Sequence, residues 1–310
     1  MGALLSVQSS LQQIAGARPG TANAAVGQAL NDAGSAGVAA RQLAQGFSTD
    51  SSSVGPDVER LLLAPATAVD PLLGGLGASG LNRRGRQFCA PLQRLMAEAP
   101  FRAAGTRQAT LGDVTSQFQR GTGAIWSFYN DALQSYLVRQ GDRYAQRPGA
   151  DLNLTSAFVE FFNRAAAFSA ALYPEGAQSP RVAFTFKPVL SDVVPQVVFV
   201  VDGRTATFTR TSTAAQPFLW DGVQAQEARM TAQIGGADVT LSGYGTWAVF
   251  RLFQSAQDWQ TRGIVQQGTW ILRHDGQAVP VPFELNLGGA APIFSHDYFR
   301  DVSCDGRIAR

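Results

Sequence analysis

The sequence is short of the residues that most catalytic and metal sites use. Its 310 residues include only two histidines, His274 and His296, and two cysteines, Cys89 and Cys304. No G-x-x-x-x-G-K-S/T or G-x-S-x-G segment occurs, which excludes a P-loop and the nucleophile elbow of the α/β-hydrolases. His296, Asp297 and Cys304 offer three mixed metal ligands without a fourth partner, which makes a weak metal site. We therefore expect no catalytic residue, no metal and no cofactor.

Charge and long apolar runs are scarce as well. Charged residues make up 15% of the chain and the formal net charge is +2, so no bulk attraction to nucleic acid is expected. No apolar run approaches the roughly 20 residues that span a bilayer, and the first residues lack the basic region of a signal peptide. Hydrophobic residues still make up 45%, enough for packed cores. These features predict a soluble piece of a larger protein.

Two cysteines are too few for a disulfide scaffold or a cysteine-based metal site. They form either one long-range disulfide, which an oxidising compartment permits, or two small buried thiols. The sequence alone favours the thiols, because two cysteines taken at random rarely have bridging geometry.

The composition changes near residue 175. Before it, apolar residues recur at helical spacing; after it, Val, Thr, Phe and Trp alternate with polar residues. Helices are predicted at 21–46, from Pro56, at 85–98, from a capping box at Thr110 and Asp113, at 125–137 and at 158–168. The segment Gly75–Gly80 fits G-x-G-x-x-G, but no strand precedes it, so we interpret it as an interhelical loop.

Strands dominate the second part. They are predicted at 182–187, 196–201, 205–211, 228–234, 237–242, 246–254, 264–273 and 277–287. Asp202-Gly203 and His274-Asp275-Gly276 are typical hairpin turns. Together the patterns predict an α+β protein, with an N-terminal all-helical domain at 1–175 and a C-terminal antiparallel β-sandwich domain at 176–310.

Several motifs, taken in order, resemble the C-terminal periplasmic region of the type VI secretion protein family IcmF/TssM. The most specific is similar to the family's G-x-W-A-L-F-R-L-L and reads Gly245-Thr246-Trp247-Ala248-Val249-Phe250-Arg251-Leu252-Phe253. Two further motifs, similar to the family's Trp-Pro-Gly and to its cysteine followed by Tyr-Pro-Phe, are Trp220-Asp221-Gly222 and Phe88-Cys89 with Ala99-Pro100-Phe101. We interpret Trp220, Gly222, Trp247, Phe250 and Arg251 as structural. Trp247, Phe250 and Arg251 are predicted on a strand covered on both faces, with the Arg251 stem buried and paired with a carboxylate.

The resemblance implies a structural component of the type VI secretion membrane complex, in the periplasmic part of an inner-membrane protein. It implies that this part binds the outer-membrane lipoprotein TssJ and assembles with TssL and other TssM copies. Because loops vary without disturbing a sandwich core, we expect the lipoprotein contact on the loops 212–217 and 256–262. The candidate contact residues are Ser212, Thr213, Gln216, Asp258 and Trp259. Trp259 is either an aromatic anchor in a polar rim or a side chain folded back onto the sandwich.

A second interpretation is a carbohydrate-binding or hydrolytic envelope domain. Surface aromatic side chains on a β-sandwich can stack sugars, and the candidates are Trp259, Trp270 and Tyr244. Specific binding of peptidoglycan fragments at these aromatics would favour this interpretation over the scaffold.

Overall fold

The computed structural model describes Ser9, Gln12 and residues 74–310 apart from four internal positions, 104, 106, 151 and 176. The chain divides into two compact units, Met1–Ser79 and Gly80–Arg310, and the second contains both the helical part and the β-sandwich. The helices predicted at 21–46 and from Pro56 lie outside the described residues. Within the described part, no helix is long and apolar enough to cross a membrane.

The helical part is built around α7 (Ser156–Leu172). Thr155 caps this helix by accepting a hydrogen bond from Phe158 N, and the helix ends at Tyr173, just before Pro174, as the sequence predicted. The other elements of this part are α4 (Gly74–Leu95), α5 (Leu111–Phe118), α6 (Ala124–Phe128), the π-helical turn η2 (Tyr129–Leu133), and strands β1 (Leu137–Gln140) and β2 (Arg143–Gln146). The capping interaction predicted at Thr110 is confirmed, because Asp113 N donates to Thr110 Oγ1 over 3.0 Å.

Two local predictions in this part are wrong. Gly75–Gly80 belongs to α4 and is not a loop; the buried Leu81, Phe88 and Leu92 that follow at helical spacing hold the helix, and packing overrides the poor helix propensity of glycine. The helix predicted through 137 ends at η2, and the chain enters the β1–β2 hairpin.

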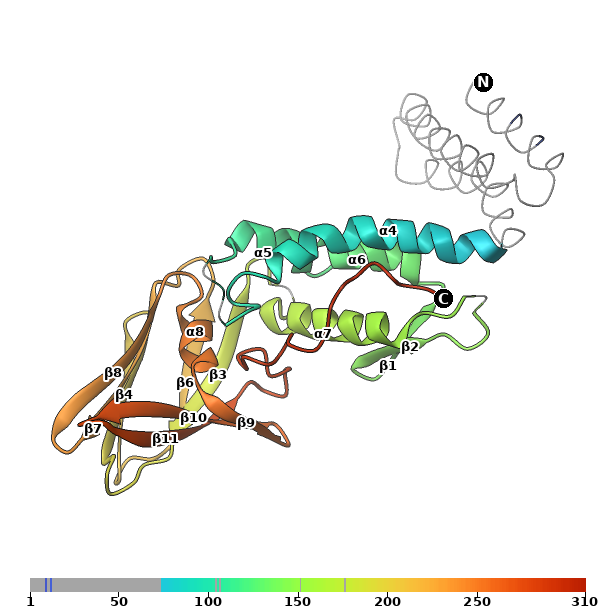
Figure 1. Ribbon diagram of the computed structural model, residues 1–310. Helices are drawn as coiled ribbons and strands as arrows, with labels where there is room; N and C mark the ends of the chain where they lie inside the picture. The colour runs from blue at the N-terminus through green and yellow to red at the C-terminus, as the bar shows by residue number, and fades with distance from the viewer. Residues whose placement is uncertain are drawn as a thin grey trace. The chain divides into compact units, whose positions relative to one another are not determined.

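Nine antiparallel strands follow and form two packed sheets (Figure 1). The five-stranded sheet has the order β6-β3-β11-β10-β9 and the four-stranded sheet the order β5-β4-β7-β8. Their bounds are β3 Arg181–Pro188, β4 Gln196–Val201, β5 Arg204–Thr209, β6 Gln216–Asp221, β7 Glu227–Ile234, β8 Ala237–Tyr244, β9 Gln257–Arg262, β10 Val265–His274 and β11 Gln277–Asn286. Helices followed by an antiparallel sandwich confirm the predicted fold class.

Two-residue turns connect the hairpins of the sandwich. Both residues have positive φ in Asp202-Gly203 and in Asp275-Gly276, the geometry of type I′ turns, so both predicted hairpins are confirmed. Between the sheets, rings from facing strands stack closely: the Phe186 and Phe199 centroids are 4.1 Å apart. Alternating inward aromatic residues therefore form the sandwich core.

The segment most similar to the IcmF/TssM motif is a helix, α8 (Ala248–Gln254), and the strand predicted at 246–254 is wrong. Every residue of α8 except Arg251 is buried, because the helix packs against both β7 and β8. Gly243 lets it approach: a Cβ there would lie 2.6 Å from Ala248 O. Arg251 is exposed and no carboxylate within the described residues pairs with it, so its predicted burial is also wrong.

After β11 the C-terminal segment, residues 287–310, runs back along the helices (Figure 1). Cys304 forms a disulfide with Cys89 of α4, so the disulfide alternative is confirmed and the favoured prediction of two thiols is wrong. Asn82 holds the segment by backbone contacts, since its Oδ1 accepts from the N–H groups of Ile308 and Ala309 at 2.7 and 2.8 Å. Leu154 and Ala309 add an antiparallel bridge. Residues last in the sequence thus belong spatially to the helical part.

Candidate functional site

The two ends of the sandwich differ. At the end that meets the helical part, four residues of the family-like motifs pack together, and we call Trp220, Gly222, Trp247 and Phe250 the joint. The indoles of Trp220 and Trp247 stack with centroids 5.1 Å apart, and Phe250 meets both edge-on. All three aromatic side chains are fully buried.

Hydrogen bonds and close packing tie the joint to the helical part. Trp247 Nε1 donates to Ala109 O over 2.7 Å, just before α5 begins. A Cβ on Gly222 would lie 3.0 Å from the Leu111 side chain, so glycine permits the close approach. Near the joint, Gln254 Nε2 donates to Pro100 O over 2.5 Å. These contacts give the motifs a structural explanation, because they connect the sandwich to the helical part.

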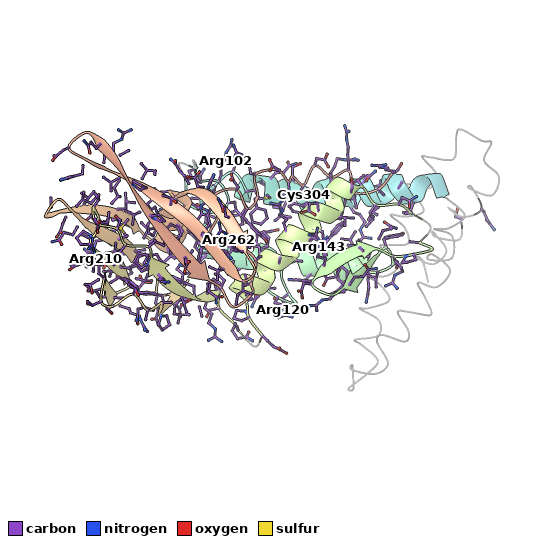
Figure 2. All side chains as sticks on the ribbon, turned by 90° about the horizontal axis from the view of Figure 1, so that it is seen from below. Arg102, Arg120, Arg143, Arg210, Arg262 and Cys304 are labelled. Atoms are coloured by element: carbon purple, nitrogen blue, oxygen red, sulfur yellow. A yellow bond between two sulfur atoms is a disulfide. The ribbon has the colours of Figure 1, made fainter. Side chains whose placement is uncertain are left out.

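The opposite end of the sandwich, the distal end, carries the loops 189–195 and 210–215. They enclose an open hollow of about 400 Å³, lined by Lys187, Pro188, Val189, Leu190, Ser191, Asp192, Arg210 and Thr213. Val189 and Val193 are 45% and 56% exposed on the first loop, which is unusual for aliphatic residues in such a small area. Arg210 pairs with Asp192 across the two loops. Figure 2 shows Arg210 at this end, away from Cys304.

The structure separates the predicted contact residues into two groups. Ser212 and Thr213 lie on the distal loop 210–215, and Gln216 begins strand β6 beside it. Asp258 and Trp259 lie on β9, at the other edge of the same sheet, with three strands between. The loop prediction for 256–262 is wrong, because these residues pair with β10. The loop 189–195 was not predicted as a candidate contact. The sequence signal for it is the pair of apolar dipeptides, Val189-Leu190 and Val193-Val194, on either side of Ser191-Asp192, because a turn does not need apolar residues.

The aromatic candidates are not equivalent. The ring of Trp259 meets Phe283 edge-on at 5.6 Å and is half-buried, so this side chain folds toward the sandwich. Trp270 is fully buried and donates from Nε1 to Leu252 O over 2.9 Å, which leaves no face for a sugar. Tyr244 is 65% exposed at the end of β8. A stacking platform of all three residues is therefore ruled out.

The histidines lie far apart and contact different partners. His274 Nε2 is 3.5 Å from Asp275 in the β10–β11 turn, and His296 Nε2 is 3.0 Å from Asp297 in the C-terminal segment. The sulfur of Cys304 is bonded to Cys89 and unavailable to a metal beside His296. In the part of the chain that the structure describes, no three His, Cys, Asp or Glu side chains gather into a metal-binding group.

The most strongly perturbed titratable group is Tyr298, in the C-terminal segment. Burial raises the pKa of its phenol far above the ordinary value, partly offset by Arg164. Its hydroxyl donates to Arg164 O over 2.9 Å, on α7. The neutral phenol therefore joins the C-terminal segment to α7 through a hydrogen bond to a helix carbonyl.

Comparison with known proteins agrees with this arrangement. Residues 184–287 match the family model of the type VI secretion protein IcmF C2-like domain. The structure is similar to the C-terminal domain of the type VI secretion protein TssM from EAEC, with 19% identity, a TM-score of 0.60, and coverage of 75% of this chain and 99% of that one. No curated protein matches the chain.

Two structures of larger assemblies are similar as well. A chain of a type VI secretion system membrane core complex has 16% identity and a TM-score of 0.60, with 99% of this chain and 61% of that chain covered. A chain of a type VI membrane complex has 15% identity and a TM-score of 0.62, with 100% and 66% covered. This chain thus spans about two thirds of the length of those relatives. The resemblance predicted from the sequence motifs is confirmed: the chain has the fold of the IcmF/TssM C-terminal region, and residues 184–287 match the model of the IcmF C2-like domain.

Proposed function

We propose that this chain is a structural, non-catalytic part of a type VI secretion membrane complex and that its sandwich binds the outer-membrane lipoprotein TssJ. In the full-length protein it would assemble with TssL and further TssM copies. The distal hollow carries the proposal. It combines exposed valines, an ion-paired arginine and two loops, and it lies at the end of the sandwich that the helical part leaves free. An apolar patch with a polar rim is the usual form of a protein contact.

The Cys89–Cys304 disulfide supports a periplasmic location. Disulfides persist in oxidising compartments and are rare in the bacterial cytosol. Both cysteines are 1% exposed, and the bridge joins segments that are 215 residues apart, so it is part of the folded core. A protein held together in this way is suited to the space between the two membranes.

The test is a binding titration of the full chain with its cognate lipoprotein. Val193→Asp places a charge on the distal loop and is expected to weaken binding by roughly tenfold or more, because an unpaired charge would be desolvated in the contact. Val223→Asp is the matched control: this valine is 66% exposed and lies in the turn after β6, at the other end of the sandwich. Binding by the control should change less than about twofold.

Three outcomes would contradict the proposal. Equal weakening by both variants would show that the distal end is not the contact. Undiminished binding by Val193→Asp, with loss in Trp259→Ala, would move the contact to the β9 edge. Retained lipoprotein binding by the Val193→Asp and Trp259→Ala variants alike would place the contact outside the sandwich loops.

A further inference from the structure

Helix α4 carries positive charge that nothing on the helix balances. Its arginines, which we call the arginine row, are Arg83, Arg84, Arg86 and Arg94. All four are exposed, and the helix contains no aspartate or glutamate. The net charge of the whole chain is only +2, so positive charge is concentrated here and offset elsewhere.

The guanidinium groups of the row are free of carboxylate partners. Arg84 donates to the backbone carbonyl of Asp131 and Arg94 to that of Ala90. Among the described residues, no ion pair involves any of the four. Carbonyl contacts orient an arginine without neutralising it, so the charge remains available to an external anion.

The C-terminal segment fixes one side of this surface and extends it. Gly306 lies directly on Arg86, since a Cβ there would be 2.8 Å from Arg86 Cα. Next to it, Arg307 is exposed and its carbonyl accepts from Thr155 Oγ1. The disulfide and Asn82 hold the segment against α4, which makes the surface a rigid one.

The surface has no apolar centre. Arg83, Gln87, Ala90 and Arg94 share the exposed face of α4, while every exposed large hydrophobic residue of the described part lies in the β-sandwich. Protein contacts of ordinary strength need an apolar core, and membrane-surface helices need an apolar face. Arg83 and Arg94 lie roughly 16 Å apart along this face, and Arg84 and Arg86 lie on either side of it. Guanidiniums spread along a helix in this way suit a polymer that carries repeated carboxylates.

We propose that the arginine row binds the carboxylates of peptidoglycan stem peptides. The choice of polymer rests on the periplasmic location proposed above, because peptidoglycan is the carboxylate-bearing polymer of that compartment. The contact would attach the assembly to the cell wall through α4 while the distal end of the sandwich binds its protein partner. It differs from sugar stacking on Trp270, which the burial of that side chain excludes.

The experiment is co-sedimentation of the full chain with purified peptidoglycan sacculi at increasing NaCl. The wild-type chain should pellet at low salt and be released as screening grows. Arg83→Glu with Arg94→Glu should reduce the bound fraction at least about tenfold, because the two new negative charges cancel the two arginines of the row that remain. The matched control is Arg229→Glu with Arg273→Glu, an equal charge change on two exposed sandwich arginines, which should reduce it less than about twofold.

Two further measurements identify the ligand group. Sacculi whose carboxylates have been amidated should no longer bind the wild-type chain. Vesicles containing phosphatidylglycerol should bind the chain only weakly, and the two double variants should bind to these vesicles equally. The proposal is overturned if the wild-type chain does not pellet with sacculi at low salt. It is also overturned if the two double variants lose sacculus binding equally, or if the wild-type chain binds amidated sacculi as well as untreated ones. Lipoprotein binding by Arg83→Glu with Arg94→Glu, measured separately, should stay at the wild-type level, so the two proposals fail independently.

Discussion

The helical part and the sandwich reach stability by different routes. Four strand pairs of the sandwich join strands that are consecutive in sequence, β4–β5, β7–β8, β9–β10 and β10–β11, and its inward rings pack between two sheets. The surface of the helical part is closed by the last residues of the chain, which Asn82 and Cys89 hold against α4. The sandwich therefore depends mostly on nearby chain, and the helical part depends on a segment more than 200 residues away.

The largest effect should come from the disulfide. Cys89→Ser with Cys304→Ser is expected to lower the free energy of unfolding by about 2–5 kcal/mol, because the link closes a very long loop and restricts the unfolded chain. Denaturant unfolding measures it. Hydrogen exchange of the double variant then separates the two parts. Protection of backbone amides in α4 should fall below the wild-type level, while protection in β10 and β11 should be unchanged. Equal loss of protection in both regions would show that the two parts unfold as one.

The joint comes next. Trp247→Phe removes the hydrogen bond to Ala109 O and part of a fully buried side chain, so a loss of about 2–4 kcal/mol is expected. Trp259→Phe is the comparison at a half-buried indole, whose Nε1 has no hydrogen-bond partner. It should cost less than about 1 kcal/mol. Similar costs for the two variants would contradict the view that the joint connects the two parts.

Two glycines of α4 test how closely the C-terminal segment packs. A Cβ at Gly85 would lie 2.6 Å from Ile308 Cγ1, whereas one at Gly80 meets nothing within 4 Å. Gly85→Ala should therefore destabilise the chain by about 1–3 kcal/mol. Gly80→Ala should stabilise it by up to about 1 kcal/mol through helix propensity. Thermal unfolding of both variants measures these changes. If Gly85→Ala stabilised the chain, the C-terminal segment would be only loosely packed against α4.

The smallest effect should appear in alkali. Burial raises the pKa of Tyr298 above the value of about 10 that it has when unfolded. The stability from its neutral, hydrogen-bonded phenol is complete below pH 10 and is lost as pH rises toward the folded pKa. Tyr298→Phe should lower the free energy of unfolding by about 1 kcal/mol at pH 8. The difference in unfolding free energy between the variant and the wild type should narrow above pH 10. Tyr244→Phe, at an exposed tyrosine, is the control. A gap that stays constant with pH would contradict the burial argument.

The predictable features of the fold are those with a local period. Alternation marked the strands β3 and β5, a continuous apolar run ending at Asp202-Gly203 marked β4, and aromatic residues at helical spacing marked α7. The segment 246–254 was misassigned because a short apolar run has no clear period. The exposed Arg251 and the exposed Ser255 just after the segment are four residues apart, which is helical spacing.

The candidate site was predictable only in part. Turn-forming residues marked the loop at Ser212 and Thr213, but no local pattern shows which loops share an end of the sandwich. Strand order decides that, and it places Asp258 and Trp259 on the opposite sheet edge. The partner of loop 210–215 is instead loop 189–195, joined to it by Arg210 and Asp192.

By itself the sequence determined the order of helical and β regions, the hairpin turns and the family-like motifs, because these follow from side-chain periodicity and from backbone preferences of adjacent residues. Only the tertiary structure decided the Cys89–Cys304 pairing, the burial of α8 and the charge surface of α4 beside Arg307. Each of these joins residues far apart in the chain, and their proximity results from the packing of whole layers, which no local sequence pattern records.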